Sequence, residues 1–295
     1  MLSASYEVVS GREPYMLRTY LLAVLVQMLA VNVLAEFGYL HVTVPENFGF
    51  ATIAAGFLFG IGMVLSVGCA GAVFFRAGEG KLDYLWVVCA FAVGVWLSND
   101  WIVEPVHKLF HITWLSTSVY RALDIDRLLF IPVFMLAVII WVLRVGNHPY
   151  KGGWKWQYTG LFIGLIGTAA WTVRAADGKP YGLGMMQGSD GLMSLLLEGD
   201  LSGLDGSLFM VLGVPLGSFI ASRLYGMSPG RPLTSNRIWR ALAGGLLMGV
   251  SAAIAMGDNV LHGLSGVPIF ALSSFSFMVS AFFGVWAGVK LNWFK

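Results

Sequence analysis

The chain has 295 residues, of which 57% are hydrophobic and only 12% are charged, and its formal net charge is +2. Soluble domains contain about a quarter charged residues, so this composition excludes a soluble globular protein and indicates that lipid is the solvent. The small net charge excludes a basic nucleic-acid-binding surface, and two cysteines are too few for a disulfide framework. We therefore expect an all-α polytopic membrane helix bundle that forms a single transmembrane domain over residues 1–295.

Eight apolar stretches are candidates for membrane spans, because a bilayer core of about 30 Å needs roughly 20 helical residues. In chain order they lie at about 15–37, 50–68, 82–98, 128–144, 157–174, 208–224, 240–257 and 268–290. Two more polar segments, at about 99–127 and 175–207, are expected to lie along the membrane surface. In the first of them, Trp101 and Trp114 are expected at headgroup depth.

The charged residues of the loops predict the orientation of the chain. Arginine and lysine dominate the loops before the first span, after every second span and at the end of the chain, whereas acidic residues dominate the alternate loops. Basic loops of membrane proteins remain in the cytoplasm. The sequence thus predicts a multi-pass protein of the cell (inner) membrane with both termini in the cytoplasm.

Two glycine-rich stretches align without a gap. GFLFGIGMVLSVGCA covers residues 56–70 and GLLMGVSAAIAMGDN covers residues 245–259, and a GVW triplet follows each of them. The alignment places Cys69 opposite Asp258. Small residues four positions apart allow helices to pack closely, and packing alone is one explanation of the pattern.

The predicted orientation sends the two aligned stretches through the membrane in opposite directions. We therefore expect an inverted repeat that relates residues 50–98 to residues 240–290. Such repeats build transporters whose substrate site lies near the midplane at interrupted helices. The glycines around Cys69, Gly68 and Gly71, permit such an interruption, as does Gly257 in the second repeat, and the freed helix ends offer N–H groups and a positive dipole end to an anion.

The same stretches resemble the two signatures of the YeeE/YedE family of sulphur-transport membrane proteins, which includes thiosulfate transporters. FGIGMVLSVGCAGAVFFRAGEGKL resembles the first signature, and ALAGGLLMGVSAAIAMGDNVLHGLSGVPIFALSSF resembles the second. The resemblance implies an hourglass-like bundle of inverted repeats, in which short helices meet at a central constriction. Cysteines at this constriction are implied to pass thiosulfate inward through S–H hydrogen bonds.

Cys69 matches the cysteine of the first signature, but two features depart from the family pattern. Asp258 stands where the second signature has a cysteine, and a cysteine near the chain start of the thiosulfate transporters has no match here. These departures bear on the identity of the anion and leave the fold and the general transport role unchanged.

Cys69 and Asp258 are accordingly the central candidates for the pathway. A neutral thiol suits a transient contact with a soft anion, although a packed thiol is the plainer alternative. A carboxylate near the bilayer centre costs roughly 2.5 kcal/mol or more, so we expect Asp258 to be protonated or hydrogen-bonded, with Asn259 and His262 as partners. As a proton donor opposite Cys69, it would favour harder anions or a proton-coupled step. The alternative is a water-exposed helix end.

The remaining titratable residues give weaker signals. Arg76 and Glu79 are expected to pair at a cytoplasmic exit, although Arg76 is also explained as an anchor for a cytoplasmic loop. His262 is either a proton-relay partner or a packed polar residue. His107 and His111 have a spacing that suits zinc, but an interfacial helix explains them better. We expect neither a metal nor a cofactor.

These observations favour a membrane transporter or channel for a small sulphur-containing or related anion such as thiosulfate, which passes a constriction at Cys69 and Asp258. An alternative is a membrane-embedded sulphur carrier or enzyme with Cys69 as a persulfide-forming nucleophile, and another is a structural subunit that anchors a partner. The expected partners are a small inorganic anion, the lipid bilayer and a cytoplasmic sulphur-carrier protein, with no nucleic acid. We expect no enzymatic activity.

Overall fold

A computed structural model of the chain describes residues 1–11, 14–110, 116–144, 154–176, 178, 181–201, 205–226 and 235–291. These parts form an all-α bundle, as expected, with one isolated β-bridge between Ser118 and Ala271 and no β-strand. The α-helices are α1 (Leu2–Val9), α2 (Tyr15–Glu36), α3 (Phe50–Leu65), α4 (Ala70–Gly78), α5 (Asp83–Ser98), α6 (Glu104–Phe110), α7 (Val119–Ala122), α8 (Arg127–Arg144), α9 (Trp156–Ala176), α10 (Met185–Leu197), α11 (Gly206–Leu224), α12 (Ser235–Ile254) and α13 (Leu272–Lys290). Two π-helical segments, η1 (Asn99–Val103) and η4 (Leu261–Gly266), and the 3-10 turn η5 (Val267–Ile269) complete them.

Fewer helices are long enough to cross a membrane than the eight that the sequence predicts. Helices occupy all eight predicted ranges. By length and composition, five candidates can cross a membrane: α2, the broken pair α3–α4, α9, α11 and α13. Helix α5 and the α6 region, which are bent by 53° at a break, together form a sixth candidate. The apolar parts of α8 and α12, Leu129–Arg144 and Ile238–Ile254, are shorter. The prediction of eight spans treated these short helices as full ones. The chain remains a multi-pass membrane protein.

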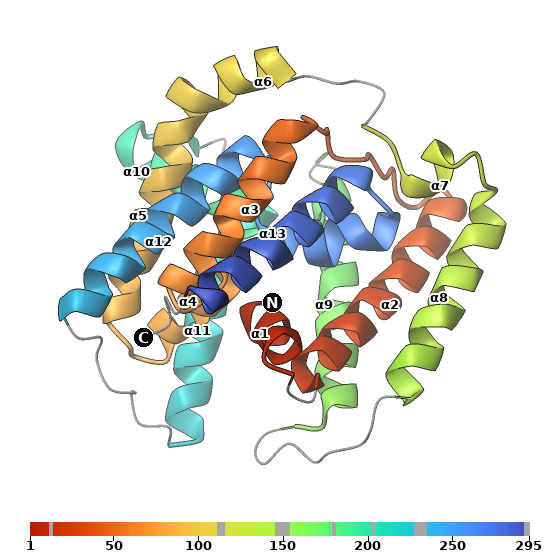
Figure 1. Ribbon diagram of the computed structural model, residues 1–295, viewed down its shortest axis with the longest axis horizontal. Coiled ribbons are helices and arrows are strands. Elements are labelled where there is room, and N and C mark those ends of the chain that lie inside the picture. Colours follow the sequence, from red (N-terminus) through yellow and green to blue (C-terminus); the bar gives the residue numbers. More distant parts are fainter. Residues whose placement is uncertain are drawn as a thin grey trace.

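Two pairs of long helices form the centre of the bundle. Helix α3 packs along α13, α12 packs along α5, and α3 also contacts α12, while α2 packs on α9 at the side where α8 lies (Figure 1). In each of these two pairs, a glycine of one helix lies against the backbone of the other helix. A Cβ atom would lie 2.2 Å from the carbonyl oxygen of Ala281 if added to Gly60, and 2.2 Å from that of Phe91 if added to Gly249. The close approach of these helices therefore requires glycine.

Replacing either of these glycines by alanine is expected to destabilise the protein. Gly60→Ala and Gly249→Ala should each lower the free energy of unfolding by about 1–3 kcal/mol, the usual cost of overpacking. Thermal unfolding in detergent measures the effect. Gly217→Ala on α11 is the control, because no atom lies within 4 Å of its added Cβ and alanine favours a helix. Equal stability of all three variants would contradict the close packing.

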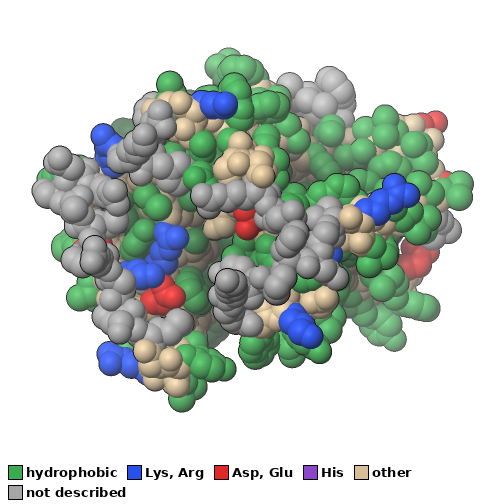
Figure 2. All heavy atoms as spheres, turned by 60° about the horizontal axis from the view of Figure 1, so that its bottom comes forward, with side chains coloured by type: hydrophobic (Ala, Val, Ile, Leu, Met, Phe, Trp, Pro, Cys, Tyr) green, Lys and Arg blue, Asp and Glu red, His purple; other side chains and the backbone are tan. Residues whose placement is uncertain are grey.

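Apolar side chains cover much of the molecular surface, as expected for a chain surrounded by lipid. On the face in Figure 2, Lys and Arg side chains are scattered among apolar ones and do not gather into one charged patch. Large apolar residues such as Leu129, Phe209 and Leu216 are more than half exposed. This surface suits a bilayer rather than water.

Candidate functional site

The first broken helix turns directly before Cys69. Helix α3 closes with a hydrogen bond of 3.0 Å from the N–H of Gly68 to the carbonyl of Met63, and one of 3.2 Å from the N–H of Val67 to the carbonyl of Val64. This pattern is a Schellman cap. Its left-handed residue is Val67, with φ of 54°, a conformation that a β-branched residue rarely adopts. Cys69 is extended, and α4 starts at the next residue.

The second broken helix repeats this geometry in the register of the sequence alignment. The N–H of Gly257 bonds to the carbonyl of Ala252 at 2.8 Å, and that of Met256 to the carbonyl of Ala253 at 3.1 Å. Met256 is again left-handed, with φ of 56°. Asp258 follows the cap as Cys69 does. Two left-handed residues that are not glycine, in the same place of two similar segments, indicate that the local fold holds both breaks against an unfavourable backbone conformation.

The glycines beside the breaks provide space rather than backbone freedom. Neither Gly68 nor Gly257 has a positive φ. A Cβ on Gly68 would lie 2.9 Å from Cγ1 of Val73, and one on Gly257 would lie 2.3 Å from Cδ2 of Leu261. Each glycine thus admits the first turn of the helix that follows, so the glycines permit the break by leaving space.

Side chains satisfy the carbonyl groups that the two breaks set free. Nη1 of Arg76 donates to the carbonyl of Val67 and, at 2.9 Å, to the hydroxyl of Tyr84. In the second segment, Nε2 of Gln187 donates to the carbonyl of Met256 at 3.3 Å. Irregular backbone at membrane depth persists only with such protein partners.

The pair of Arg76 and Glu79 that the sequence predicts does not form. The carboxylate of Glu79 instead bonds to Nζ of Lys81 at 2.8 Å, and both side chains are partly exposed. Arg76 points back to the first break because its guanidinium reaches the carbonyl that the break exposes. Arg76 therefore stabilises the first break, and Glu79 pairs with Lys81 instead of Arg76.

Asp258 is fully buried and accepts four hydrogen bonds from backbone N–H groups. Oδ2 accepts from Met185 at 2.5 Å and from Met186 at 2.7 Å, which are the first residues of α10. Oδ1 accepts from Val260 at 2.6 Å and from Leu261 at 3.0 Å, in the segment that follows the break. The carboxylate therefore caps two helix starts at once, where N–H groups and the helix dipole favour a negative charge.

Asp258 is hydrogen-bonded, which is one of the two states that the sequence predicts, but its partners differ from the expected ones. Its hydrogen-bond partners are backbone N–H groups, not the side chains of Asn259 and His262, and it is not a water-exposed helix end. All four partners are donors, which an ionised carboxylate satisfies and a protonated one does not. Four donors of this kind suit an ionised carboxylate, and the sequence left both the hydrogen-bonded and the protonated state open.

His262 is buried beside this cap, and its two described side-chain hydrogen bonds go to other residues than Asp258. Its Nδ1 lies 3.0 Å from Oγ of Ser274, its Nε2 lies 3.2 Å from the carbonyl oxygen of Ala255, and its ring stacks on Phe277. A carbonyl only accepts, so the contact with Ala255 assigns a proton to Nε2, while the hydroxyl of Ser274 can donate to Nδ1 or accept from it. The contact with Asp258 is a backbone one, from the N–H of His262 to the carbonyl of Asp258. A direct proton relay between the two side chains is therefore not formed.

Cys69 lies where several donors meet and is 8% exposed. The amino nitrogen of Met1 is 3.9 Å from Sγ, and backbone N–H groups of Leu2 and Ala72 face the sulfur. On α2, the buried hydroxyl of Tyr20 has no hydrogen-bond partner among the described residues, and a Cβ on Gly263 would lie 2.1 Å from it. This donor-rich surrounding suits a negatively charged ligand beside the thiol.

The sites of Cys69 and Asp258 adjoin each other. A Cβ on Gly71, in the first turn of α4, would lie 3.5 Å from Cγ2 of Val260 and 3.8 Å from Cε of Met185. One buried cluster contains Cys69, Met185 and Val260 together. Next to Asp258, the side-chain oxygen of Asn259 is buried and has no partner in the described part of the chain.

The sequence interpretation missed Tyr20 and helix α10. Tyr20 is one tyrosine in an otherwise ordinary apolar span, and nothing in its sequence neighbourhood marks it. Helix α10 falls in the segment that the sequence assigns to the membrane surface, but its first turn, with Met185 and Met186, is buried against Asp258. The glycines around it, Gly184 and Gly188, were the available signal of close packing.

Two further residues from the sequence analysis have no part in this site. Nε2 of His107 bonds to the carbonyl oxygen of Ile254 at 2.8 Å, and its ring stacks on Phe48, while His111 lies outside the described residues. Within the described residues, no group of three His, Cys, Asp or Glu side chains could hold a metal ion. Cys89 is exposed.

A separate polar cavity of about 420 Å³ lies between the C-terminal end of α2, the loop that follows it, and the start of α8. Arg121, Arg127, His41 and Ser116 are among its lining residues, together with Ser118. The hydroxyl of Ser118 is buried and has no partner among the described residues. Two guanidinium groups and an unpaired hydroxyl are a donor set that suits an oxyanion.

Comparisons with known proteins agree with this picture. Residues 1–287 match the model of a family described as Sulphur transport. The chain is 27% identical over 291 residues to "Thiosulfate transporter TsuA" of Escherichia coli, with 90% of this chain and 81% of the relative covered. It is 25% identical over 307 residues to "Thiosulfate transporter TsuA" of Spirochaeta thermophila, with 96% and 90% covered. A shorter match, 34% identical over 98 residues, covers 32% of this chain and 24% of "Probable transporter YedE" of Escherichia coli.

Proposed function

The chain belongs to the sulphur transport family, and on that premise we propose that it carries a small sulphur-containing anion such as thiosulfate across the membrane, past a constriction at Cys69. Two relatives that match most of the chain are named thiosulfate transporters. The single observation that carries the proposal is the position of Cys69, a thiol at a helix break that faces N–H donors and lies 3.9 Å from the amino nitrogen of Met1.

The comparison of the two breaks supports an anion as the ligand. At the second break, the carboxylate of Asp258 occupies the N–H groups of two helix starts. At the equivalent place in the first break stands Cys69, which brings no negative charge of its own when it is a thiol. Helix starts favour an anion, so a diffusible anion at Cys69 would complete the first break as Asp258 completes the second. A thiol donates a weak hydrogen bond, which suits a soft sulphur anion that must leave again.

We propose further that residues 50–98 and 240–290 are inverted repeats, with Cys69 and Asp258 at equivalent places. The matching caps, the matching left-handed residues and the exchanged pairing of α3 with α13 and of α12 with α5 support this relation. The loop charges support cytoplasmic termini in the inner membrane. In that orientation, the polar cavity beside Arg121 opens to the outside.

The polar cavity would then collect the anion before it reaches Cys69. Arg121→Gln is expected to raise the KM of uptake about tenfold with little change in the maximal rate, since one charge-assisted hydrogen bond to the entering anion is lost. Initial uptake rates in proteoliposomes measure both constants. Arg144→Gln, which removes an exposed arginine at the opposite end of α8, is the control. An unchanged KM in Arg121→Gln would exclude this entrance.

The identity of the anion is tested by competition. Purified protein in proteoliposomes should take up labelled thiosulfate, and unlabelled sulfite, sulfide and selenium oxyanions should be compared as competitors. We expect thiosulfate itself to compete best, because its outer sulfur is soft and its three oxygens accept hydrogen bonds. Absence of thiosulfate uptake, with another anion transported, would keep the transport role and overturn the substrate.

A further inference from the structure

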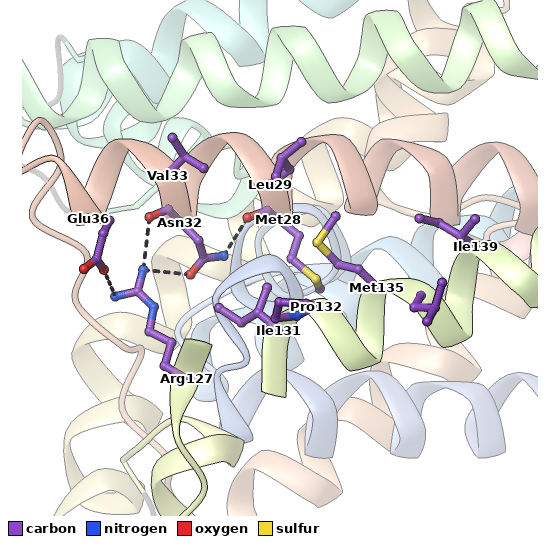
Figure 3. Close-up of a pocket in the computed structure, with 11 residues that line it drawn as sticks. Met28, Leu29, Asn32, Val33, Glu36, Arg127, Ile131, Pro132, Met135 and Ile139 are labelled. Atoms are coloured by element: carbon purple, nitrogen blue, oxygen red, sulfur yellow. Dashed lines mark hydrogen bonds and ion pairs between the residues drawn. The ribbon is translucent and has the colours of Figure 1, made fainter. Parts of the chain in front are cut away.

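A groove of about 480 Å³ runs between α2 and α8 and carries charge at one end only. Its polar residues, Asn32, Glu36 and Arg127, lie together where α2 ends and α8 begins (Figure 3). The rest of its wall is apolar and includes Met28, Leu29, Val33, Ile131, Leu136 and Ile139. The groove is separate from the helix breaks around Cys69.

The charged end is held in a fixed geometry but is not saturated. Nη2 of Arg127 donates to the carbonyl oxygen and to Oδ1 of Asn32, both at 3.1 Å, and Nδ2 of Asn32 donates to the carbonyl of Met28 at 2.7 Å. Nη1 of Arg127 lies 3.7 Å from Oε2 of Glu36, which is longer than a normal hydrogen bond. The side chains of Arg127 and Glu36 are 30% and 61% exposed, so both can take an external partner.

The length and position of the groove match one leaflet of a bilayer. Ile139 lies twelve positions after Arg127 on α8, and a helix rises 1.5 Å per residue, so the groove extends about 18 Å from the helix end. One leaflet contributes about half of a hydrocarbon core of about 30 Å. The outer walls at Leu29 and Leu136 are 56% and 58% exposed, which leaves the groove open to the surrounding lipid.

We propose that this groove binds one zwitterionic phospholipid of the phosphatidylethanolamine class, at a site that shares Asn32 and Arg127 with the neighbouring polar cavity. The phosphate would contact the guanidinium of Arg127, the ammonium group would contact the carboxylate of Glu36, and one acyl chain would lie along the apolar wall. Opposite charges 3.7 Å apart complement a headgroup that carries both signs. A headgroup that carries only negative charge would be repelled by the carboxylate of Glu36. The unbranched side chains of Met28 and Met135 adapt easily to an acyl chain.

Native mass spectrometry of delipidated protein tests this proposal. The protein is titrated with phosphatidylethanolamine and with phosphatidylglycerol of the same acyl chains. We expect one tight site for phosphatidylethanolamine, weakened about tenfold or more in Arg127→Gln, the loss expected for a hydrogen bond between charged groups. Glu36→Gln should remove the preference for phosphatidylethanolamine over phosphatidylglycerol.

A substitution that fills the groove separates this site from general lipid contact. Leu136→Trp should abolish the tight site, whereas Leu216→Trp, at a similarly exposed position on α11, should leave it intact. Tight binding that persists in Leu136→Trp would overturn the proposal. So would a dimer that only Leu136→Trp dissociates, since the groove would then belong to a second copy of the chain. Equal affinity of the wild type for both lipids would overturn the zwitterionic assignment.

Discussion

Replacing Cys69 by alanine is expected to abolish most thiosulfate uptake while the protein stays folded. The substitution removes the thiol at the first break, so the anion loses its S–H donor there and keeps only the N–H donors of Leu2 and Ala72. A hydrogen bond to a charged partner contributes about 1.5–3 kcal/mol, so the initial uptake rate should fall at least about tenfold. Uptake into proteoliposomes with equal amounts of reconstituted protein measures this loss.

Cys89→Ala is the matched control for this experiment. Cys89 lies in α5, away from the helix ends that form the two breaks, and is free and exposed. Its replacement should leave uptake unchanged. If Cys69→Ala and Cys89→Ala both transport at the wild-type rate, Cys69 is a packing residue and the proposed constriction is wrong.

Replacing Asp258 is expected to have the largest effect on stability. Asp258→Ala leaves four buried N–H groups without an acceptor, and each unsatisfied group costs about 1–3 kcal/mol. The total is a large fraction of the roughly 5–15 kcal/mol that stabilises a folded protein, so we expect little folded protein from this variant. Asp258→Asn keeps the size of the side chain but turns an NH₂ group toward N–H donors, so its melting temperature should drop clearly.

Thermal unfolding in detergent measures the effect of Asp258→Asn, with Asp124→Asn as the control. Asp124 is exposed and left-handed, a conformation that asparagine tolerates. The control should melt as the wild type does. If Asp258→Asn instead keeps the wild-type melting temperature and loses the pH dependence of transport, Asp258 acts as a proton donor and not as a fixed anion.

The sequence was sufficient for the all-α bundle, because hydropathy is a local signal, although it predicted eight full spans where five or six helices pass. The inverted repeat remains a prediction that the matching helix caps support. The sequence did not predict which groups bind the carboxylate of Asp258. A carboxylate in an apolar stretch signals only that something neutralises it, and the N–H groups that do so come partly from α10, more than seventy positions earlier in the chain. The same limit applies to Tyr20, whose position beside Gly263 depends on how α2 packs. The expected contact between Arg76 and Glu79 failed because a freed carbonyl at Val67 attracts the guanidinium.

The central claim is that an intact anion passes Cys69, and uptake of thiosulfate labelled on one or the other sulfur tests it most directly. In transport, both labels should enter proteoliposomes at the same rate, and neither should remain on the protein. In the alternative reaction, the Cys69 thiolate would attack the outer sulfur, the S–S bond of thiosulfate would break, sulfite would leave and a persulfide would form. Equal entry of both labels is the result we predict. Label from the outer sulfur alone, retained on Cys69 while labelled sulfite is released, would contradict the account.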